Sequence, residues 1–210
     1  MTNCKSAKVL IDCTCLVGSY TGLATYVLEL VCEYERTTQF KYYYLTTCNG
    51  KAQLLQKLPS LNEDRIIVID FHNTGFHREI FFLKNRKWLK QFELYHCLHS
   101  YAPIFYDKKR LVVTVHDLKY VDFPSYIGST IKSLAIRLYI KNSYRRSTAC
   151  ICISHFTHNR LIQRFGDKPH GECKTIYHGT DDKSSVHKEV EASSSSFLLF
   201  VGENRPHKKY

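Results

Sequence analysis

The chain has 210 residues, of which 44% are hydrophobic, and its formal net charge at pH 7 is +11. This length supports one sizeable core or a domain and a half, and the hydrophobic fraction excludes an intrinsically disordered chain. The positive charge favours anionic partners, namely nucleotide phosphates, nucleic acid or an acidic membrane surface, without choosing among them. No run of about 18 apolar residues is present, so we expect no membrane-spanning helix.

The first half of the chain alternates predicted strands with predicted helices. KVLIDC is typical of a buried strand, the glycine-bearing turn GSYTG follows, and apolar residues then recur at helical spacing on one stripe. In chain order we expect a strand over residues 8–13, a helix over 23–34, a strand over 40–47, a short helix over 51–58, a strand over 65–70 and an amphipathic helix over 78–92.

The second half continues this alternation. In chain order we expect strands over residues 94–99 and 111–115, a helix over 131–145, a short strand over 149–153, a helix from the N-cap Ser154 to Phe165, and strands in KTIYHG and FLLFVG. Strands alternating with helices predict an α/β fold, with a Rossmann-like, mostly parallel sheet and helices on both faces.

The polar stretch between residues 180 and 196 ends in SSSS and is typical of a linker. We therefore expect an N-terminal domain over residues 1–179, a linker over 180–196, and the first strand and loop of a second domain over 197–210. A parallel strand without a following crossover cannot bury both of its faces. The chain is therefore expected to be truncated, with an incomplete second domain.

The nine cysteines are an odd number, and no apolar signal-peptide segment precedes them. Cys13 and Cys15, like Cys150 and Cys152, alternate along predicted strands, and neither pair has the Cys-x-x-Cys spacing of a zinc or redox site. We expect reduced, mostly buried thiols in a cytoplasmic protein.

Five segments occur in order along the chain, namely GSYTGLATYVLEL, LYHCLHSYAPIFYDKKRLVVTVHDL, CICISHFTHNRLIQRFG, KTIYHGTDD and FLLFVGENRPHKK. Together they resemble family 4 glycosyltransferases, whose GT-B fold pairs two facing Rossmann-like domains, and the resemblance is strongest over residues 111–208. It implies transfer of a hexose from a nucleotide sugar to a glycan or lipid-linked acceptor. It also implies retention of anomeric configuration, with no essential metal and no separate cofactor.

His116 and Asp117 directly follow the apolar strand LVVTV, at the strand end where open α/β sheets place their ligands. The resemblance implies that His116 is the catalytic residue, since a family histidine at this position contacts the transferred sugar. A neutral imidazole can hydrogen-bond a sugar hydroxyl and favour developing positive charge. Asp117 either fixes the tautomer of His116 or caps the next turn. The alternative is that both residues belong to an ordinary loop edge.

The resemblance also implies three donor-phosphate-binding residues. Gly22 lies in the first loop, where glycine lets the backbone approach a ligand, and Arg205 and Lys208 follow FLLFVG, where cations hold the donor diphosphate. The alternatives are an ordinary turn and a solvated basic terminus. In the first loop Ala24 and Thr25 replace a glycine and an arginine of the family pattern TGIGRY, which leaves acceptor binding there an open question.

Ser154 matches a serine at the start of a family helix, and its more common role is that of an N-cap. His155 and His158 are three residues apart, like His96 and His99, but a zinc site needs more ligands within reach. We therefore expect no metal site.

The amphipathic segment 78–92 has two interpretations. It is either a helix that covers the sheet with its basic residues in water, or one that docks on an anionic membrane with Trp88 at the interface. Its basic arc consists of Lys84, Arg86, Lys87 and Lys90.

Two other classes of function compete with a glycosyltransferase. A non-catalytic GT-B half, acting as a binding module or partner subunit, is favoured because the family's acidic donor-binding motif is not among these 210 residues, and the chain alone is then expected to be inactive. A nucleic-acid-binding protein is disfavoured because the basic residues are spread over several segments and form no recognition motif. We therefore expect no nucleic-acid partner.

Overall fold

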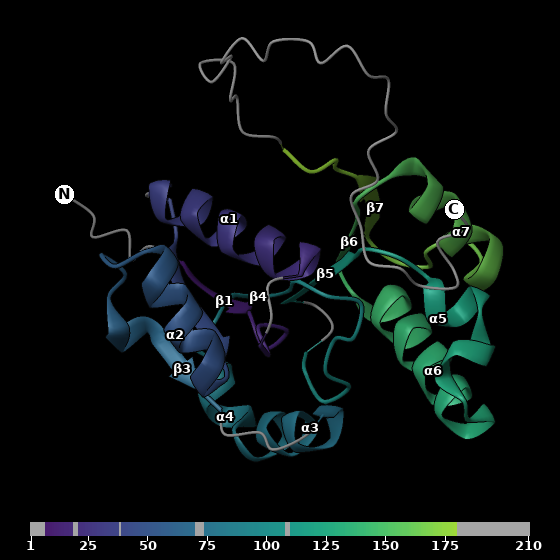
Figure 1. Ribbon diagram of the computed structural model, residues 1–210, viewed down its shortest axis with the longest axis horizontal. Coiled ribbons are helices and arrows are strands. Elements are labelled where there is room, and N and C mark those ends of the chain that lie inside the picture. The colour runs from purple at the N-terminus through teal and green to yellow at the C-terminus, as the bar shows by residue number, and fades with distance from the viewer. Residues whose placement is uncertain (1–6, 19–20, 38, 70–73, 108–109, 180–210) are drawn as a thin grey trace, which may run out of the picture. The chain divides into compact units, whose positions relative to one another are not determined.

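The structure of the protein, a computed structural model, describes residues 7–18, 21–37, 39–69, 74–107 and 110–179 (Figure 1). Apart from Gly179, these residues belong to one compact unit that ends at His178. The expected linker, the expected strand in FLLFVG, and the cations Arg205 and Lys208 lie outside the described residues.

In the described part of the chain, seven strands form one sheet in the order β3-β2-β1-β4-β5-β6-β7, and every neighbouring pair is parallel. This arrangement confirms the predicted α/β, Rossmann-like fold. The sheet grows outward in opposite directions from β1 and from β4, so the topological switch point, where such sheets bind ligands, lies between these two strands. The strands are β1 (Lys8–Asp12), β2 (Lys41–Thr46), β3 (Ile66–Val68), β4 (Leu94–Cys97), β5 (Leu111–Val115), β6 (Ala149–Cys152) and β7 (Glu172–Thr175).

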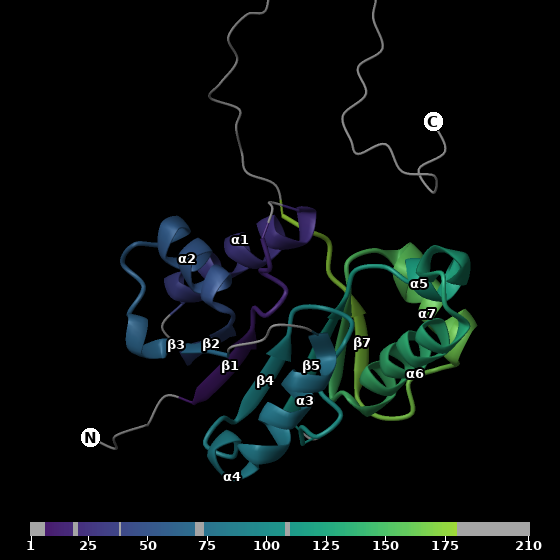
Figure 2. The same cartoon turned by 60° about the horizontal axis from the view of Figure 1, so that its bottom comes forward.

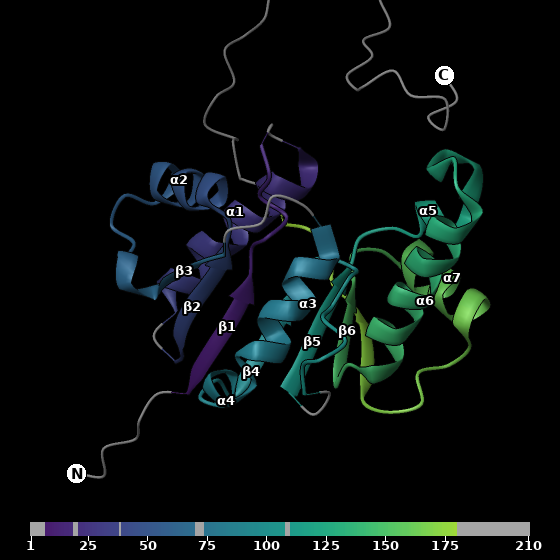
Figure 3. The same ribbon diagram turned by 90° about the horizontal axis from the view of Figure 1, so that it is seen from below.

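The helices cover both faces of the sheet. Alternate residues of β1 point to opposite faces, so Ile11 packs in one core with Val27 and Leu54, and Leu10 packs in a second core with Phe82. Figure 1 shows α1 above the strands and α3 and α4 below them, and Figure 3 shows α3 in front of the sheet, running alongside β1 and β5. The helices are α1 (Gly22–Arg36), α2 (Cys48–Lys57), α3 (Thr74–Lys84), α4 (Arg86–Leu89), α5 (Lys119–Asp122), α6 (Thr130–Arg146) and α7 (His155–Phe165).

Strand β5 lies in the interior of the sheet, with β4 on one side and β6 on the other. Leu111, Val113 and Val115 are fully buried on one face, and Thr114 is fully buried on the other. A strand buried on both faces agrees with its near-continuous apolar sequence. Its carboxyl end therefore opens among neighbouring strand ends, which is where His116 follows.

The predicted helix over residues 78–92 is wrong in its extent. It is two helices, α3 and α4, separated at Asn85. The Asn85 side chain donates from Nδ2 to the Phe81 carbonyl at 2.9 Å, and its backbone N–H donates to the same carbonyl at 3.0 Å. An asparagine that hydrogen-bonds the preceding turn competes with continuation of the helix.

The last described strand begins earlier than predicted. The expected strand in KTIYHG starts at Lys174, whereas β7 starts at Glu172, whose N–H donates to the Thr148 carbonyl at 3.1 Å. The residue before it, Gly171, has φ +74°, and a Cβ there would lie 1.7 Å from the Thr148 oxygen. Only glycine fits this turn, because it is both left-handed and in close contact with a backbone.

The eight cysteines among the described residues are free thiols, and Cys13, Cys97, Cys150 and Cys152 are buried. Within the described part of the chain, none of the helices has the length and hydropathy needed to cross a membrane.

Candidate active site

The carboxyl ends of the parallel strands lie along one edge of the sheet (Figure 2). Asp12 ends β1, His116 follows β5, and Ser154 follows β6. Gly22 begins α1, which follows β1 through the first loop. The fold therefore brings four residues from distant segments to the edge where open α/β sheets bind their ligands.

His116 is partly buried, and its ring is held in a defined orientation. Nε2 lies 2.9 Å from the Leu98 carbonyl oxygen. A carbonyl oxygen can only accept, so Nε2 carries the proton and Nδ1 of the neutral ring is an acceptor. Burial lowers the pKa of His116, the bond to Leu98 opposes this effect, and His178 reinforces it. The ring is therefore neutral at pH 7, with one nitrogen able to accept a hydrogen bond.

Two aromatic rings surround His116. Tyr26 of α1 meets it edge to face at 4.7 Å between ring centroids, and His178 lies 5.8 Å away. Tyr26 and His178 stack on each other at 4.8 Å with an interplanar angle of 26°. The three rings come from the first helix, an interior strand end and the end of the compact unit. The cluster places two further aromatic rings beside the acceptor nitrogen of His116, and such an arrangement suits a sugar ring.

Asp117 does not contact the His116 ring through a described hydrogen bond. It is exposed, and its Oδ1 accepts from the backbone N–H of Lys119 at 3.1 Å. Of the two roles left open by the sequence, the geometry therefore shows the turn-capping one. The Leu98 carbonyl fixes the tautomer instead, and no sequence pattern indicated this contact.

Ser154 caps α7, and its neighbour Thr157 connects that helix to His116. The Ser154 hydroxyl accepts from the Thr157 N–H at 3.1 Å, as the N-cap prediction requires. The buried Thr157 hydroxyl donates to the His116 backbone carbonyl, also at 3.1 Å. The cap thus fixes the start of α7, and α7 in turn fixes the backbone of His116.

Gly22 is the first residue of α1, behind the N-cap Thr21, whose hydroxyl accepts from the Ala24 N–H at 3.2 Å. A Cβ built at Gly22 would meet no atom within 4 Å. Packing within the described chain therefore does not require glycine here, and open space lies beside the backbone. Thr25, in place of the family's arginine, is exposed and turns its hydroxyl back to the Thr21 carbonyl at 3.3 Å.

A second group of polar residues at this edge was not identified from the sequence. Asp12 is fully buried, and its Oδ1 accepts from the backbone N–H and the hydroxyl of Thr14 at 2.9 and 2.5 Å. Its Oδ2 accepts from the Tyr95 hydroxyl and lies 3.4 Å from a guanidinium nitrogen of Arg78. The same nitrogen donates to His99 Nε2 at 2.9 Å. We call these five residues the Asp12 cluster.

Asp12 is ionised despite its burial. Burial alone would raise the pKa of its carboxyl, but His99, Arg78 and the Thr14 hydroxyl together hold it well below its usual range. The sequence signal was available, because Asp12 ends an apolar strand just as His116 follows one. Its partner Arg78 could not be inferred, because it lies 66 residues away on a helix for which the sequence left a sheet-covering and a membrane-docking role open.

His96 and Thr114 connect the site to the covering helix α1. His96 is buried, with Nδ1 2.9 Å from the Tyr34 hydroxyl and Nε2 2.9 Å from the Thr114 hydroxyl. The Thr114 hydroxyl lies 3.4 Å from that of Tyr26, the ring that meets His116. Burial lowers the pKa of His96 to about 4, so this histidine is a neutral structural residue.

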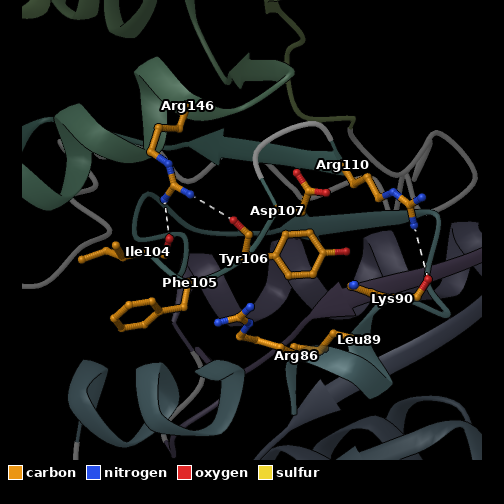
Figure 4. Close-up of a pocket in the computed structure, with 9 residues that line it drawn as sticks. All are labelled: Arg86, Leu89, Lys90, Ile104, Phe105, Tyr106, Asp107, Arg110 and Arg146. Carbon is orange, nitrogen blue, oxygen red and sulfur yellow. Dashed lines mark hydrogen bonds between the residues drawn. The ribbon is translucent and has the colours of Figure 1, made fainter. Parts of the chain in front are cut away.

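A separate cavity of about 550 Å³ is lined by residues that precede β4 and β5, together with Arg146 at the end of α6. Figure 4 shows four cations at this cavity, namely Arg86, Lys90, Arg110 and Arg146, with Arg110 donating to the Lys90 carbonyl at 3.3 Å. Arg146 donates to the carbonyls of Ile104 and Tyr106 at 2.6 and 3.0 Å. Among the described residues that line the cavity, these four are cationic and Asp107 is acidic, so the cavity is strongly basic.

The fold is an α/β domain, and a neutral histidine lies at the carboxyl edge of its parallel sheet, where open α/β sheets bind their ligands. A family model described as Glycosyltransferase Family 4 matches residues 20–184, which is most of the chain. The chain belongs to glycosyltransferase family 4, as its resemblance to that family predicted. A search of curated proteins gives no match.

Proposed function

We propose that this glycosyltransferase domain forms the acceptor side of a retaining hexosyltransferase. The donor is a nucleotide sugar, and the acceptor is a glycan or a lipid-linked saccharide. The observation that carries this proposal is the position of His116 at the end of interior strand β5, with Nε2 bonded to Leu98 and Nδ1 as the acceptor nitrogen. A polar group fixed in this way at a strand end is suited to contact a substrate rather than to stabilise the core.

In this proposal each residue at the edge has a limited role. His116 Nδ1 accepts a hydrogen bond from a hydroxyl of the transferred hexose and favours the positive charge that develops on the sugar ring. Tyr26 and His178 hold the sugar against His116 with the ring surfaces that their mutual stacking leaves open, and they exclude water. The open space beside Gly22 admits a phosphate or a hydroxyl to the backbone at the start of α1. Arg205 and Lys208 neutralise the leaving diphosphate, and transfer requires no metal and no cofactor.

The proposal is tested by replacing His116 in a preparation that transfers sugar. His116→Ala is expected to lower the initial rate by about 100-fold, which is the usual effect of losing one well-placed polar group at a reacting centre. Its melting temperature should change little, because a partly buried side chain at the rim contributes little packing. His170→Ala, which removes an exposed histidine, is the control. Normal turnover in His116→Ala would refute the assignment, and a large fall in melting temperature would support a structural role.

The identity of the donor sugar and the stereochemistry of the transfer need a separate measurement. Nucleotide sugars are offered singly, and the anomeric configuration of the product is read by NMR. Retention is the expected result, and an inverted product would contradict the proposed mechanism.

The alternative is a non-catalytic GT-B half that binds a ligand or a partner subunit. It is favoured by Thr25, whose hydroxyl turns back to its own helix where the family has a guanidinium. The 210-residue chain alone is expected to show no transfer, because it lacks the family's acidic donor-binding motif. Saturable sugar binding without turnover, in every preparation and with every nucleotide sugar tested, would favour the binding module. Turnover by the 210-residue chain would exclude it.

We further propose that the protein is cytoplasmic and contacts an anionic membrane through α4 and the basic cavity beside it. Trp88 is 39% exposed, although its ring also packs on the rings of Phe81 and Phe92, with 6.3 and 5.0 Å between the ring centroids. Arg86 and Lys90 are exposed next to it. Such a surface combines an interfacial aromatic ring with cations. Co-sedimentation with phosphatidylserine vesicles, but not with phosphatidylcholine vesicles, is expected, and equal binding to both would contradict an electrostatic contact.

A further inference from the structure

Strands β6 and β7 bring three thiols together on one face of the sheet. Cys150 and Cys152 are two residues apart on β6 and therefore point to the same face, and Cys173 of β7 lies opposite Cys150 in the strand register. The three Sγ atoms lie within 4.8 Å of one another, and those of Cys152 and Cys173 are 3.6 Å apart. We call these residues the thiol cluster.

The surroundings of the thiol cluster are largely enclosed. Cys150 and Cys152 are buried in the core that includes Leu161 and Phe165 of α7, and Cys173 is only partly buried. β7 is the edge strand of the described sheet, which gives the cluster a route to solvent.

Helix α7 brings an imidazole to the same place. Thr175 is two residues beyond Cys173 and shares its face, and Nδ1 of His158 lies 3.2 Å from the Thr175 hydroxyl. His155 also approaches Thr175, at 3.3 Å. Both histidines of α7 therefore contact a residue that shares a face with the thiol cluster. Cys150 and Cys173 are 23 residues apart in the chain, and the sequence alone gave no reason to connect them.

We propose that Cys150, Cys152 and Cys173 form a binding site for one thiophilic d¹⁰ cation, Zn²⁺ or Cu⁺. Where four ligands are needed, the fourth is His158, whose ring must turn from Thr175 towards the three sulfurs to reach the ion. A Zn–S distance of about 2.3 Å places tetrahedral thiolates about 3.8 Å apart, and trigonal ones about 4.0 Å apart. The observed 3.6 Å between Cys152 and Cys173 is close to both values. Three sulfurs and an imidazole are also the ligand types that such ions prefer.

This site is structural and has no part in sugar transfer. The ion joins the edge strand β7 to β6 and thereby holds the chain segment that continues to His178. Binding releases the thiol protons to solvent, so the affinity rises with pH. Asp12, Cys97 and His99 form a second group that could hold a metal ion, but the guanidinium of Arg78 lies 3.4 Å from Asp12 and already supplies the positive charge.

The test uses the full chain, reduced and freed of metal, with Zn²⁺ and Cu⁺ added separately. Elemental analysis is expected to find about one equivalent of metal per chain in at least one of the two separate experiments, with Zn²⁺ or with Cu⁺. Binding of the ion should raise the melting temperature of the protein. Cobalt(II) should give the intense near-ultraviolet absorption of thiolate coordination. Cys173→Ser should weaken binding by at least 10-fold, and Cys152→Ser provides a second test should the first variant fold poorly. Cys32→Ser, on α1, should bind like the wild type.

Two matched comparisons locate the site. His158→Ala should weaken Zn²⁺ binding by about 10-fold, while His155→Ala should not, and a Cu⁺ site with three sulfurs should be insensitive to both. Equal effects of the two histidine variants on Zn²⁺ binding would overturn the assignment of the fourth ligand.

The whole proposal is overturned by binding of less than about 0.1 equivalent per chain for both ions. It is also overturned by binding that Cys97→Ser abolishes and Cys173→Ser leaves intact. A Cys152–Cys173 disulfide that forms in the presence of either ion, with no metal bound, would overturn it as well.

Discussion

The hydroxyl of Thr157 donates to the backbone carbonyl of His116 at 3.1 Å, and this bond links the first turn of α7 to the end of β5. The imidazole is therefore held at two points, by Leu98 at the ring and by Thr157 at the backbone. A side chain that acts on a substrate benefits from such support, because small displacements of a reacting group are costly.

Replacing Thr157 by valine tests this support. The variant keeps the shape of the side chain but removes the donor, so the unfolding free energy should fall by about 1–2 kcal/mol, and transfer should fall by about 10-fold through displacement of His116. Initial rates and thermal melts measure the two effects. Thr157→Ser should restore most of the rate, because it keeps the hydroxyl. An unaltered rate in Thr157→Val would show that the bond serves only the fold.

Gly22→Ala separates packing from ligand binding. A Cβ at this position meets no atom within 4 Å, and alanine favours a helix, so the variant should be more stable than the wild type by roughly 0.4–1 kcal/mol. If the backbone approaches a phosphate or a hydroxyl there, the same methyl group should weaken nucleotide-sugar binding by about 10-fold or more. Calorimetric titration measures the affinity for the nucleotide sugar, and thermal melts measure the stability. Unaltered affinity would remove Gly22 from the site.

Arg78→Met should be strongly destabilising. It leaves the fully buried Asp12 carboxylate without its cation, and removing one partner of a buried ion pair costs about 3–5 kcal/mol. Adding Asp12→Asn to the same chain should recover part of this loss, so the two effects should not be additive. Denaturant unfolding of the two single variants and the double variant measures the coupling. Strict additivity would show that the two side chains do not interact.

Stability should depend on pH through His96. Its pKa is lowered to about 4 in the folded chain, from 6.5 in the unfolded chain, because it is buried. Between these values the unfolded state binds the extra proton, so lowering the pH from about 6.5 to about 4 should reduce the free energy of unfolding by up to about 3 kcal/mol. Above pH 6.5 the ring is neutral in both states and contributes no slope.

His96→Gln removes the titrating group, so the variant should show a shallower loss of stability across this pH window. Urea unfolding at a series of pH values measures the slope. His170→Gln, which removes an exposed imidazole, is the comparison and should keep the wild-type slope. Equal slopes for all three proteins would mean that His96 does not link folding to pH.

The strand and helix order followed from the sequence because periodicity is a local property. β5 was identified from five apolar or β-branched residues, and the cap at Ser154 from one residue and its neighbours. The break at Asn85 was missed because the apolar pattern continues across it, while a single side-chain bond to Phe81 ends the helix. Local patterns therefore gave the elements but not every boundary.

The candidate site was predictable only in part, for a different reason. His116 was singled out because it follows a recognisable strand and because it matches a histidine of the family that the chain resembles. The contacts that fix it come from Leu98, Tyr26 and His178, and no local sequence pattern predicts which distant segments pair. The Asp12 cluster was missed for the same reason, since Asp12 meets Arg78 across a separation of 66 residues.

Gly171 has an influence that reaches beyond its own turn. Its left-handed backbone, pressed against the Thr148 carbonyl, admits no side chain, so the turn fixes the residue at which β7 starts to pair with β6. In a strand, a shift of one residue exchanges the two faces. A slip at this turn would move Cys173 away from Cys150 and alter the path of the chain towards His178. The left-handed φ angle of Gly171, at the start of the last described strand, thus influences two places. It aligns Cys173 with the rest of the thiol cluster, and it affects where His178 lies beside His116.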